Sequence, residues 1–202
     1  STFANANTIF NVVAAGGKTW GLYYQKTGPA VTGEPTFEPF TSYLFPKMND
    51  APGGDTHDWS TFASQLADGS LPNFCFLEPY WGGGKGNVLD PTGTTWFGLQ
   101  GNDYHPPAFV GPAEADLNTL YNALVNSPQW DNMLFVITFD EHGGTWDHVS
   151  PTATISPDDH EGTSGFKFDR LGVRVPTILI SPYAPKGMVF RAPDGSTYDF
   201  DH

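Results

Sequence analysis

The sequence predicts an α/β fold with a mostly parallel central sheet flanked by helices. Helix-like and strand-like patterns alternate along the chain, which is typical of parallel sheets with crossover helices. Two apolar runs, MLFVITF (133–139) and TILIS (177–181), are continuous rather than alternating. Such runs fit strands that are covered on both faces, so we expect both to be buried strands of the parallel sheet.

The first part of the chain predicts a helix, a strand and a long loop. Asn7 or Thr8 can cap the helix, which ends at Gly16 and Gly17 and whose apolar residues are Ile9, Phe10, Val12 and Val13. The run TWGLYY (19–24) predicts a strand. Residues 28–57 are rich in Gly and Pro, and we expect a loop there.

A second helix, a strand and a longer helix should follow. Asp58 can cap the second helix and Gly69 can end it, and its apolar face is Trp59, Phe62, Ala63 and Leu66. NFCFLEP (73–79) predicts the strand. The longer helix opens at Pro112 and closes at Ser127 and Pro128, with Leu117, Leu120, Tyr121 and Leu124 in register.

The charge of the chain is strongly acidic, with 22 Asp and Glu against 9 Lys and Arg and a formal charge of −13. This argues against nucleic acid as a partner, because phosphate binding needs a basic stripe. An anionic membrane surface would repel the chain as a whole, although a local site could still act on lipid. A cation-binding site fits such a background, and solubility alone is the alternative explanation.

The length and the single cysteine set further limits. The 202 residues are enough for one domain with a core. Cys75 alone excludes an internal disulfide and a cysteine-based metal cluster, and we expect it to be a small buried core residue. No apolar run is long enough to cross a bilayer, and no signal peptide opens the sequence. A mature secreted chain and an internal fragment would both look like this.

The strongest functional signal is FDEHGGTWDH (139–148). Asp140 and Glu141 directly follow an apolar run, at the kind of strand end where α/β sheets gather ligands, and Glu78 lies at another such end. A bound cation would offset the unfavourable burial of Asp140 and Glu141; an N-cap or a nearby arginine is the alternative. Oxygen and imidazole ligands suit Mg²⁺, Ca²⁺, Mn²⁺ or Zn²⁺, and the sequence does not choose between them.

Other polar residues are weaker candidates. GNDYHPP (101–107) offers Asp103 and His105 in a loop, where simple solvent exposure is the alternative for the histidine. We expect His57 in a polar loop and His160 on the surface. Arg170 and Arg174 could meet an anionic substrate, but ion pairs that fix the loop before the last strand are favoured. No serine is marked as a nucleophile, and no nucleophile elbow, phosphate-binding loop or dinucleotide fingerprint is present.

These motifs resemble the phosphoesterase family. The specific segments are SPQWDNMLFVITFDEHGGTWDHV (127–149), GNDYHPP and FKFDRLGVRVPTILISPYAPKG (166–187). A looser likeness is found at TIFNVVAAGGKTWGLYY (8–24) and LADGSLPNFCFLEP (66–79). The resemblance thus extends from about Thr8 to His202. The family holds non-specific, phosphatidylcholine-hydrolysing phospholipases C and related acid phosphatases. It implies an alkaline-phosphatase-like α/β fold and metal-assisted cleavage of phosphate esters.

The resemblance also implies roles for individual residues. Asp140 and Glu141 match the family's metal-binding acidic pair, so a divalent metal ion is the expected cofactor. His105 matches a histidine near the substrate phosphate, and His142 and His148 lie inside the same acidic motif as further catalytic candidates. Asp103, beside His105, and His202, in YDFDH (198–202), are the candidates for substrate binding.

The chain also departs from the family pattern. The family's ENRSFDHYFG element and its nucleophile region have no counterpart here. We therefore expect residues 1–202 to be a single domain that forms the C-terminal part of a larger catalytic domain, incomplete at both ends. The leading hypothesis is a phosphoesterase acting on a phospholipid or a small phosphomonoester. The alternative is a catalytically incomplete fragment or a non-catalytic metal- or phosphate-binding module. The resemblance further implies secretion.

Overall fold

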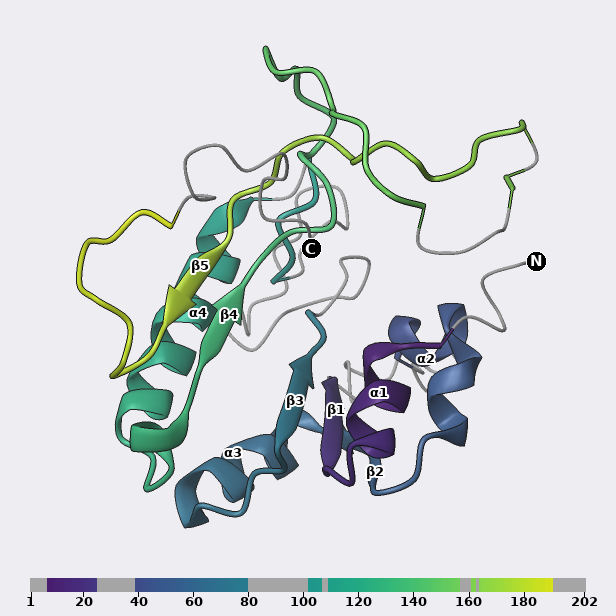
Figure 1. The fold of residues 1–202 in the computed structure, drawn as a ribbon. Helices are drawn as coiled ribbons and strands as arrows, with labels where there is room; N and C mark the ends of the chain where they lie inside the picture. The colour runs from purple at the N-terminus through teal and green to yellow at the C-terminus, as the bar shows by residue number, and fades with distance from the viewer. Residues whose placement is uncertain are drawn as a thin grey trace, which may run out of the picture. The chain divides into compact units, whose positions relative to one another are not determined.

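The computed structural model describes residues 7–24, 39–79, 102–106, 109–156, 161–162 and 164–190. The chain forms two compact units, Ser1–Trp130 and Asp131–His202. The labelled elements of each unit are shown in Figure 1.

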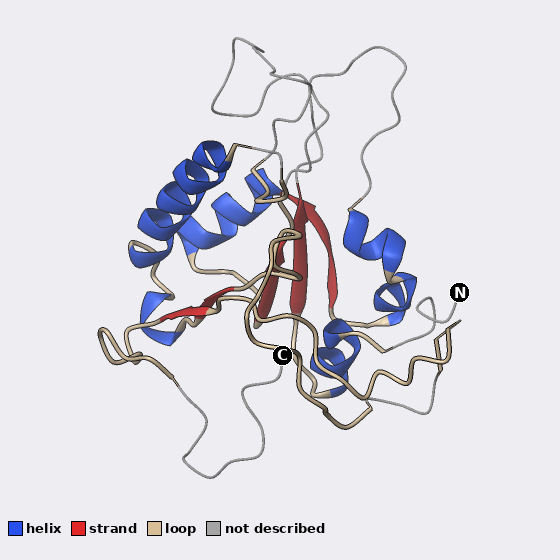
Figure 2. Cartoon of the chain, turned by 90° about the horizontal axis from the view of Figure 1, so that it is seen from above, coloured by secondary structure: helices blue, strands red, loops and turns tan. Residues whose placement is uncertain are grey.

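A parallel sheet forms the centre of the first unit. The elements in chain order are α1 (Ile9–Ala15), β1 (Trp20–Tyr24), α2 (Phe40–Leu44), the 3₁₀ helix η2 (Pro46–Asp50), β2 (Gly54–Asp58), α3 (Trp59–Asp68), β3 (Phe74–Leu77) and α4 (Val110–Val125). The three strands are parallel and lie in the order β2-β1-β3. Figure 2 shows this sheet with helices on both sides. The predicted α/β architecture is therefore confirmed.

The central strand β1 is buried along its whole length. Successive side chains of a strand point to opposite faces, so Trp20 and Leu22 share one face and Tyr23 lies on the other. On the first face, the rings of Trp20 and Phe10 of α1 pack edge to face within the hydrophobic core, with their centres 5.0 Å apart. On the second face, the ring of Tyr23 meets that of Phe62 of α3 at 5.1 Å. One helix therefore covers each face of β1.

The predicted helix ends agree with the structure. Thr8 precedes α1, and its backbone N–H and its hydroxyl both donate to Asn11 Oδ1, at 2.8 and 2.7 Å. Asp58 caps α3 by accepting from the backbone N–H of Ser60 at 2.9 Å. Gly69 ends α3 with φ of +76°, a left-handed conformation that glycine adopts without strain. The longer helix α4 begins at Val110, slightly before the predicted Pro112.

The prediction of a loop over residues 28–57 is wrong for residues 39–57, the part of this range that the structure describes. Residues 39–58 contain α2, η2 and the edge strand β2. The sequence of β2, GDTHD, has no apolar residue and so gives no strand signal. It is a strand because its backbone pairs with β1 over the full register from Trp20↔Gly54 to Tyr24↔Asp58. His57 consequently lies on a strand and not in a loop, with its ring 5.4 Å from the ring of Tyr23.

The second unit contains a two-stranded sheet of β4 (Phe135–Ile137) and β5 (Ile178–Ile180). The 3₁₀ helix η3 (Trp130–Asn132) includes the sequence boundary between the two units. The strands are antiparallel, with Phe135 opposite Ile180. The expectation that both runs are parallel strands covered on both faces is therefore wrong. Val136 and Ile178 remain 47% and 50% exposed. A continuous apolar run indicates a strand but carries no information on its partner or direction.

The burial of β1 can be tested with two matched leucine substitutions in the first unit. Leu22 is fully buried, whereas Leu44 of α2 is 53% exposed. Leu22→Ala should lower the free energy of unfolding by about 2–5 kcal/mol, because it opens a cavity in a close-packed core. Leu44→Ala should lower it by less than about 1 kcal/mol, as at most exposed positions. Urea denaturation checks both values, and equal losses would contradict the placement of β1.

Candidate functional site

The loop after β4 carries the acidic motif that the sequence singles out. It runs from Asp140 and Glu141 through two glycines to His148. Gly143 and Gly144 both have φ of +73°, a region that side-chain-bearing residues rarely adopt. The glycine pair therefore allows a tight turn directly after the two carboxylates.

Glu141 stabilises this turn through one carboxylate oxygen. Its Oε2 accepts from the backbone N–H of Gly143 at 2.6 Å and from that of Gly144 at 3.2 Å, and it lies 3.3 Å from His142 Nδ1. Partial desolvation raises the pKa of Glu141, but the contacts with His142 and the two glycine amides outweigh it and hold that pKa below its usual range. The carboxylate of Glu141 therefore stabilises the turn of its own loop.

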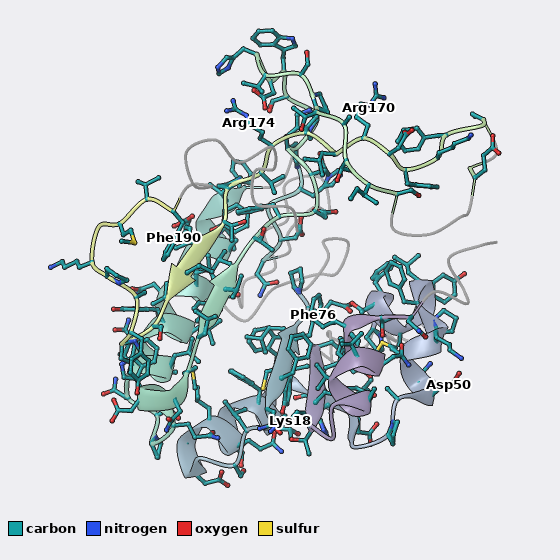
Figure 3. The ribbon with its side chains drawn as sticks, in the orientation of Figure 1. Lys18, Asp50, Phe76, Arg170, Arg174 and Phe190 are labelled. Carbon is teal, nitrogen blue, oxygen red and sulfur yellow. The ribbon has the colours of Figure 1, made fainter. Side chains whose placement is uncertain are left out.

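Asp147 ties the far end of the loop to the segment before β5. Its carboxylate accepts from Arg174 Nε at 2.8 Å and from Arg174 Nη2 at 2.7 Å, which is a bidentate pair, and from the Val149 N–H at 3.0 Å. These bonds, led by the one from Arg174, hold the pKa of Asp147 well below its usual range. The ion pair predicted for Arg174 is thus confirmed, and Figure 3 shows Arg174 among the loops of this unit.

The partner of Arg174 was not identified from the sequence. In the sequence, Asp147 and His148 form an acid–imidazole pair of potential metal ligands, and this pattern does not indicate an ion pair for the aspartate. The signal that could have found it is the expectation of an ion pair for Arg174, since Asp147 is one of the acidic residues that the sequence offers as its partner. For Arg170, the structure shows the guanidinium 5.8 Å from the ring centre of Phe166, and its ion pair stays a prediction.

Glu78, the other strand-end carboxylate, has a structural role. Its residue is only 4% exposed, and its two oxygens accept from the backbone N–H groups of Phe40 at 2.8 Å and Thr41 at 3.0 Å. These are the first two residues of α2, whose N–H groups have no partner inside the helix. Glu78 is therefore a capping residue of α2.

Asp103 and His105 lie in a short segment anchored to α4. Asp103 is buried, and its Oδ1 accepts from the backbone N–H of His105 at 2.8 Å. Asn102 donates to Asp116 at 2.8 Å, and Tyr104 donates to Glu114 at 2.5 Å. Burial, together with the Glu114 carboxylate, raises the pKa of Tyr104 to about 12. His105 is exposed on this anchored segment, and the substrate-binding role of Asp103 stays a prediction.

Cys75 is less buried than expected. It lies on β3 at intermediate exposure, and its Sγ donates to the carbonyl of Pro72 at 3.7 Å. Burial raises the pKa of the thiol to about 11, an effect that a hydrogen bond with Tyr23 only partly reverses. A thiol in this state is a poor nucleophile near neutral pH.

A shallow pocket of about 340 Å³ lies elsewhere in the first unit. Its lining includes Thr19, Gly53 and Leu71, which directly precede or lie near the amino ends of the three strands. Parallel sheets bind ligands beyond the carboxyl ends of their strands. The pocket therefore lies at the edge of this sheet opposite to the one where parallel sheets bind ligands.

The described residues do not form a complete metal site. Asp140 and Glu141 are adjacent oxygen donors, which suits a hard divalent cation. In the described ranges, however, no group of three or more His, Cys, Asp or Glu side chains is arranged to hold a metal ion. His142 and His148 share the loop with the two carboxylates, Asp103 and His105 belong to the first unit, and His202 and His160 lie outside the described residues.

In the part of the chain that the structure describes, the helices could not span a membrane. None of them combines the length and the apolar character needed to cross a bilayer.

The capping role of Glu78 predicts a loss of stability on substitution. Glu78→Gln keeps one acceptor oxygen but turns its N–H₂ group toward one of the backbone N–H groups at the start of α2. We expect the free energy of unfolding to fall by about 1–3 kcal/mol, the usual effect of leaving polar groups at a buried side chain unpaired. Asp50→Asn is the control, since it removes only the surface ion pair with Lys47 and should change stability by less than about 1 kcal/mol. Equal effects in chemical denaturation would refute the capping role.

The lowered pKa of Asp147 predicts an acid-dependent contribution to stability. A carboxyl group whose pKa is lower in the folded state stabilises the fold above its unfolded pKa of about 3.9, and this contribution is lost as the pH falls through the folded value. The difference in melting temperature between wild type and Asp147→Asn should therefore be constant above about pH 5 and shrink at lower pH. Thermal melts between pH 2 and 7 check this. A difference that does not change with pH would show that the charge of Asp147 is not involved.

Comparisons with known proteins point in one direction. A model of the phosphoesterase family matches residues 2–202. Non-specific phospholipase C3 of Arabidopsis thaliana is 35% identical over 205 residues, which cover 96% of this chain and 34% of that protein. Non-specific phospholipase C6 of the same plant is 42% identical over 140 residues, which cover 67% of this chain and 25% of that protein.

A bacterial relative is more distant. Phospholipase C A of Mycobacterium tuberculosis is 25% identical over 206 residues, which cover 92% of this chain and 35% of that protein. The chain thus spans about a third of the length of most of these relatives, and a quarter of one. Since the family model matches almost every residue, the chain belongs to the phosphoesterase family.

Proposed function

We propose that this chain is part of a hydrolase that cleaves phosphate esters, of the phospholipase C or acid phosphatase type. The observation that carries the proposal is the loop after β4. In it, the adjacent carboxylates of Asp140 and Glu141 precede a glycine turn whose shape Glu141 itself stabilises. Membership in the phosphoesterase family over nearly the whole chain supports the same chemistry.

The residues suit phosphoryl transfer, in which positioning and charge neutralisation matter more than covalent chemistry from the protein. Asp140 and Glu141 would hold a divalent cation, which when bound neutralises phosphoryl oxygens and activates the nucleophile. Its identity among Ca²⁺, Mg²⁺, Mn²⁺ and Zn²⁺ is open. The described residues would supply two of its ligands, and we propose that the remaining ligands and the nucleophile come from residues outside the described ranges.

The histidines are proposed to move protons. His105 is exposed on its anchored segment, where it can donate to a nonbridging phosphoryl oxygen or protonate the leaving group. His142 and His148 belong to the loop of the acidic pair and are the further catalytic candidates. Histidine suits these roles because imidazole in general exchanges protons near neutral pH. Asp103 and His202 are retained as proposed substrate-binding residues.

The substrate is proposed to be a phospholipid such as phosphatidylcholine, because several relatives are named phospholipase C. Cleavage would then release diacylglycerol and a phosphorylated headgroup. A small phosphomonoester is the alternative substrate, as in acid phosphatases. Secretion is likewise proposed from the family resemblance.

The proposal predicts metal-dependent hydrolysis that requires Asp140. The full-length protein, supplied in turn with Ca²⁺, Mg²⁺, Mn²⁺ and Zn²⁺, should cleave phosphatidylcholine vesicles or a soluble aryl phosphate. Asp140→Asn should lower kcat/KM by at least about 100-fold, since it removes a charged ligand of the ion. Asp131→Asn, at an exposed residue of η3 just before the motif, is the matched control and should retain activity.

The two substrates separate the two types of enzyme. Release of diacylglycerol without cleavage of the aryl phosphate indicates a phospholipase, and the reverse indicates a phosphatase. If the wild-type protein cleaves neither with any metal, and calorimetry detects no binding of these ions, the chain is a non-catalytic module and the proposed function is wrong.

A further inference from the structure

We propose that Arg174 is a positioning residue of the active site, which acts through Asp147 to hold the loop after β4 and to orient His148. The inference rests on the proposed function for its catalytic consequence. Its structural part rests only on contacts within the second unit, between residues that the structure describes.

The pair between Arg174 and Asp147 is well suited to fixing an orientation. Two parallel N–H···O bonds, of 2.8 and 2.7 Å, join the planar guanidinium to both carboxylate oxygens. Such a fork permits one relative orientation, whereas a single ammonium contact permits many. The side chain of Asp147 is only 14% exposed and that of Arg174 is 59% exposed, so solvent screens the aspartate end of the pair less than it screens an open surface ion pair.

Asp147 in turn holds the backbone on both sides of His148. The carboxylate belongs to the residue before the histidine, and it accepts the N–H of Val149, the residue after it, at 3.0 Å. The imidazole Nδ1 lies 3.6 Å from Asp147 Oδ1, which is too long for a hydrogen bond but close enough for electrostatic attraction. With Nδ1 facing Asp147, Nε2 is the ring nitrogen available to a substrate.

The same geometry argues against direct binding of phosphate by Arg174. Both its Nε and Nη2 donate to Asp147, and the carboxylate neutralises the charge that would attract an anion. Loss of Arg174 should consequently act on turnover and not on substrate binding.

The pair is also not the only connection between its two segments. Backbone bonds join them nearby, from Thr154 N to Asp169 O and from Leu171 N to Thr152 O, each at 2.9 Å. These bonds do not involve the side chain of Arg174. A variant at Arg174 should therefore keep the segments together while it loses the contact that orients the Asp147–His148 end.

A double-mutant cycle in the full-length protein tests the catalytic part. Arg174→Gln and Asp147→Asn should each lower kcat by about 10–100-fold, the usual effect of losing an orienting partner, with KM changed by less than about twofold. The double variant should be no slower than the slower single variant, because both remove the same pair. Arg174→Lys should recover part of the loss, since it restores the charge without the fork. Additive losses, a raised KM or an unchanged kcat would each overturn the proposal.

Amide hydrogen exchange tests the structural part without any enzyme assay. In Arg174→Gln, the N–H of Val149 should exchange about tenfold faster or more, since its acceptor loses its anchor, while the N–H of Thr154 should not change. Arg170→Gln, in the same segment, is the matched control and should leave Val149 as in the wild type. Unchanged exchange at Val149 in Arg174→Gln would refute the positioning role.

The two readouts separate the two hypotheses. If Val149 exchanges faster in Arg174→Gln but the wild-type protein cleaves no phosphate ester, the positioning of the loop is retained and the phosphoesterase function is rejected. Active wild-type enzyme with unchanged exchange would reject the positioning alone.

Discussion

The complete burial of β1 is the constraint on which the first unit depends. A buried backbone must find hydrogen-bond partners along both edges, and β1 obtains them from β2 on one edge and β3 on the other. This requirement makes a strand of GDTHD, although none of its side chains favours burial. The alternating faces of β1 then require one apolar layer each, which Phe10 and Phe62 provide from α1 and α3.

Polar contacts play a larger part in the second unit. Its strands β4 and β5 are short and partly exposed, and a two-stranded sheet alone is only marginally stable in water. The loop after β4 is instead shaped by charged groups that accept backbone N–H groups: Glu141 takes those of Gly143 and Gly144, and Asp147 takes that of Val149. Because Arg174 holds Asp147, one side chain from a later segment influences the shape of the Asp147–His148 end of the motif.

The ends of helices could be predicted from the sequence, whereas the pairing of strands could not. Asp58 and Gly69 mark the ends of α3 correctly because capping depends on the chemistry and φ of a single residue. The parallel sheet followed from the alternation of helices and strands. The strand β2 and the antiparallel pairing of β4 with β5 were missed, because strand partners lie far away in the sequence. The role of Glu78 depended equally on a distant partner, the start of α2.

The hydrogen bonds of the carboxylates explain why Asp140 and Glu141 remain the metal candidates. The charge of Glu78 is met by two backbone N–H groups, and that of Asp147 by a guanidinium. A cation binding at either would have to displace those partners, whose loss is unfavourable for a charged group. Asp140 is exposed, and the contacts of Glu141 converge on Oε2, so that its Oε1 is the oxygen better placed for a cation. The same bonds that shape the loop would then orient its second carboxylate before any ion arrives, which lowers the entropy lost on binding.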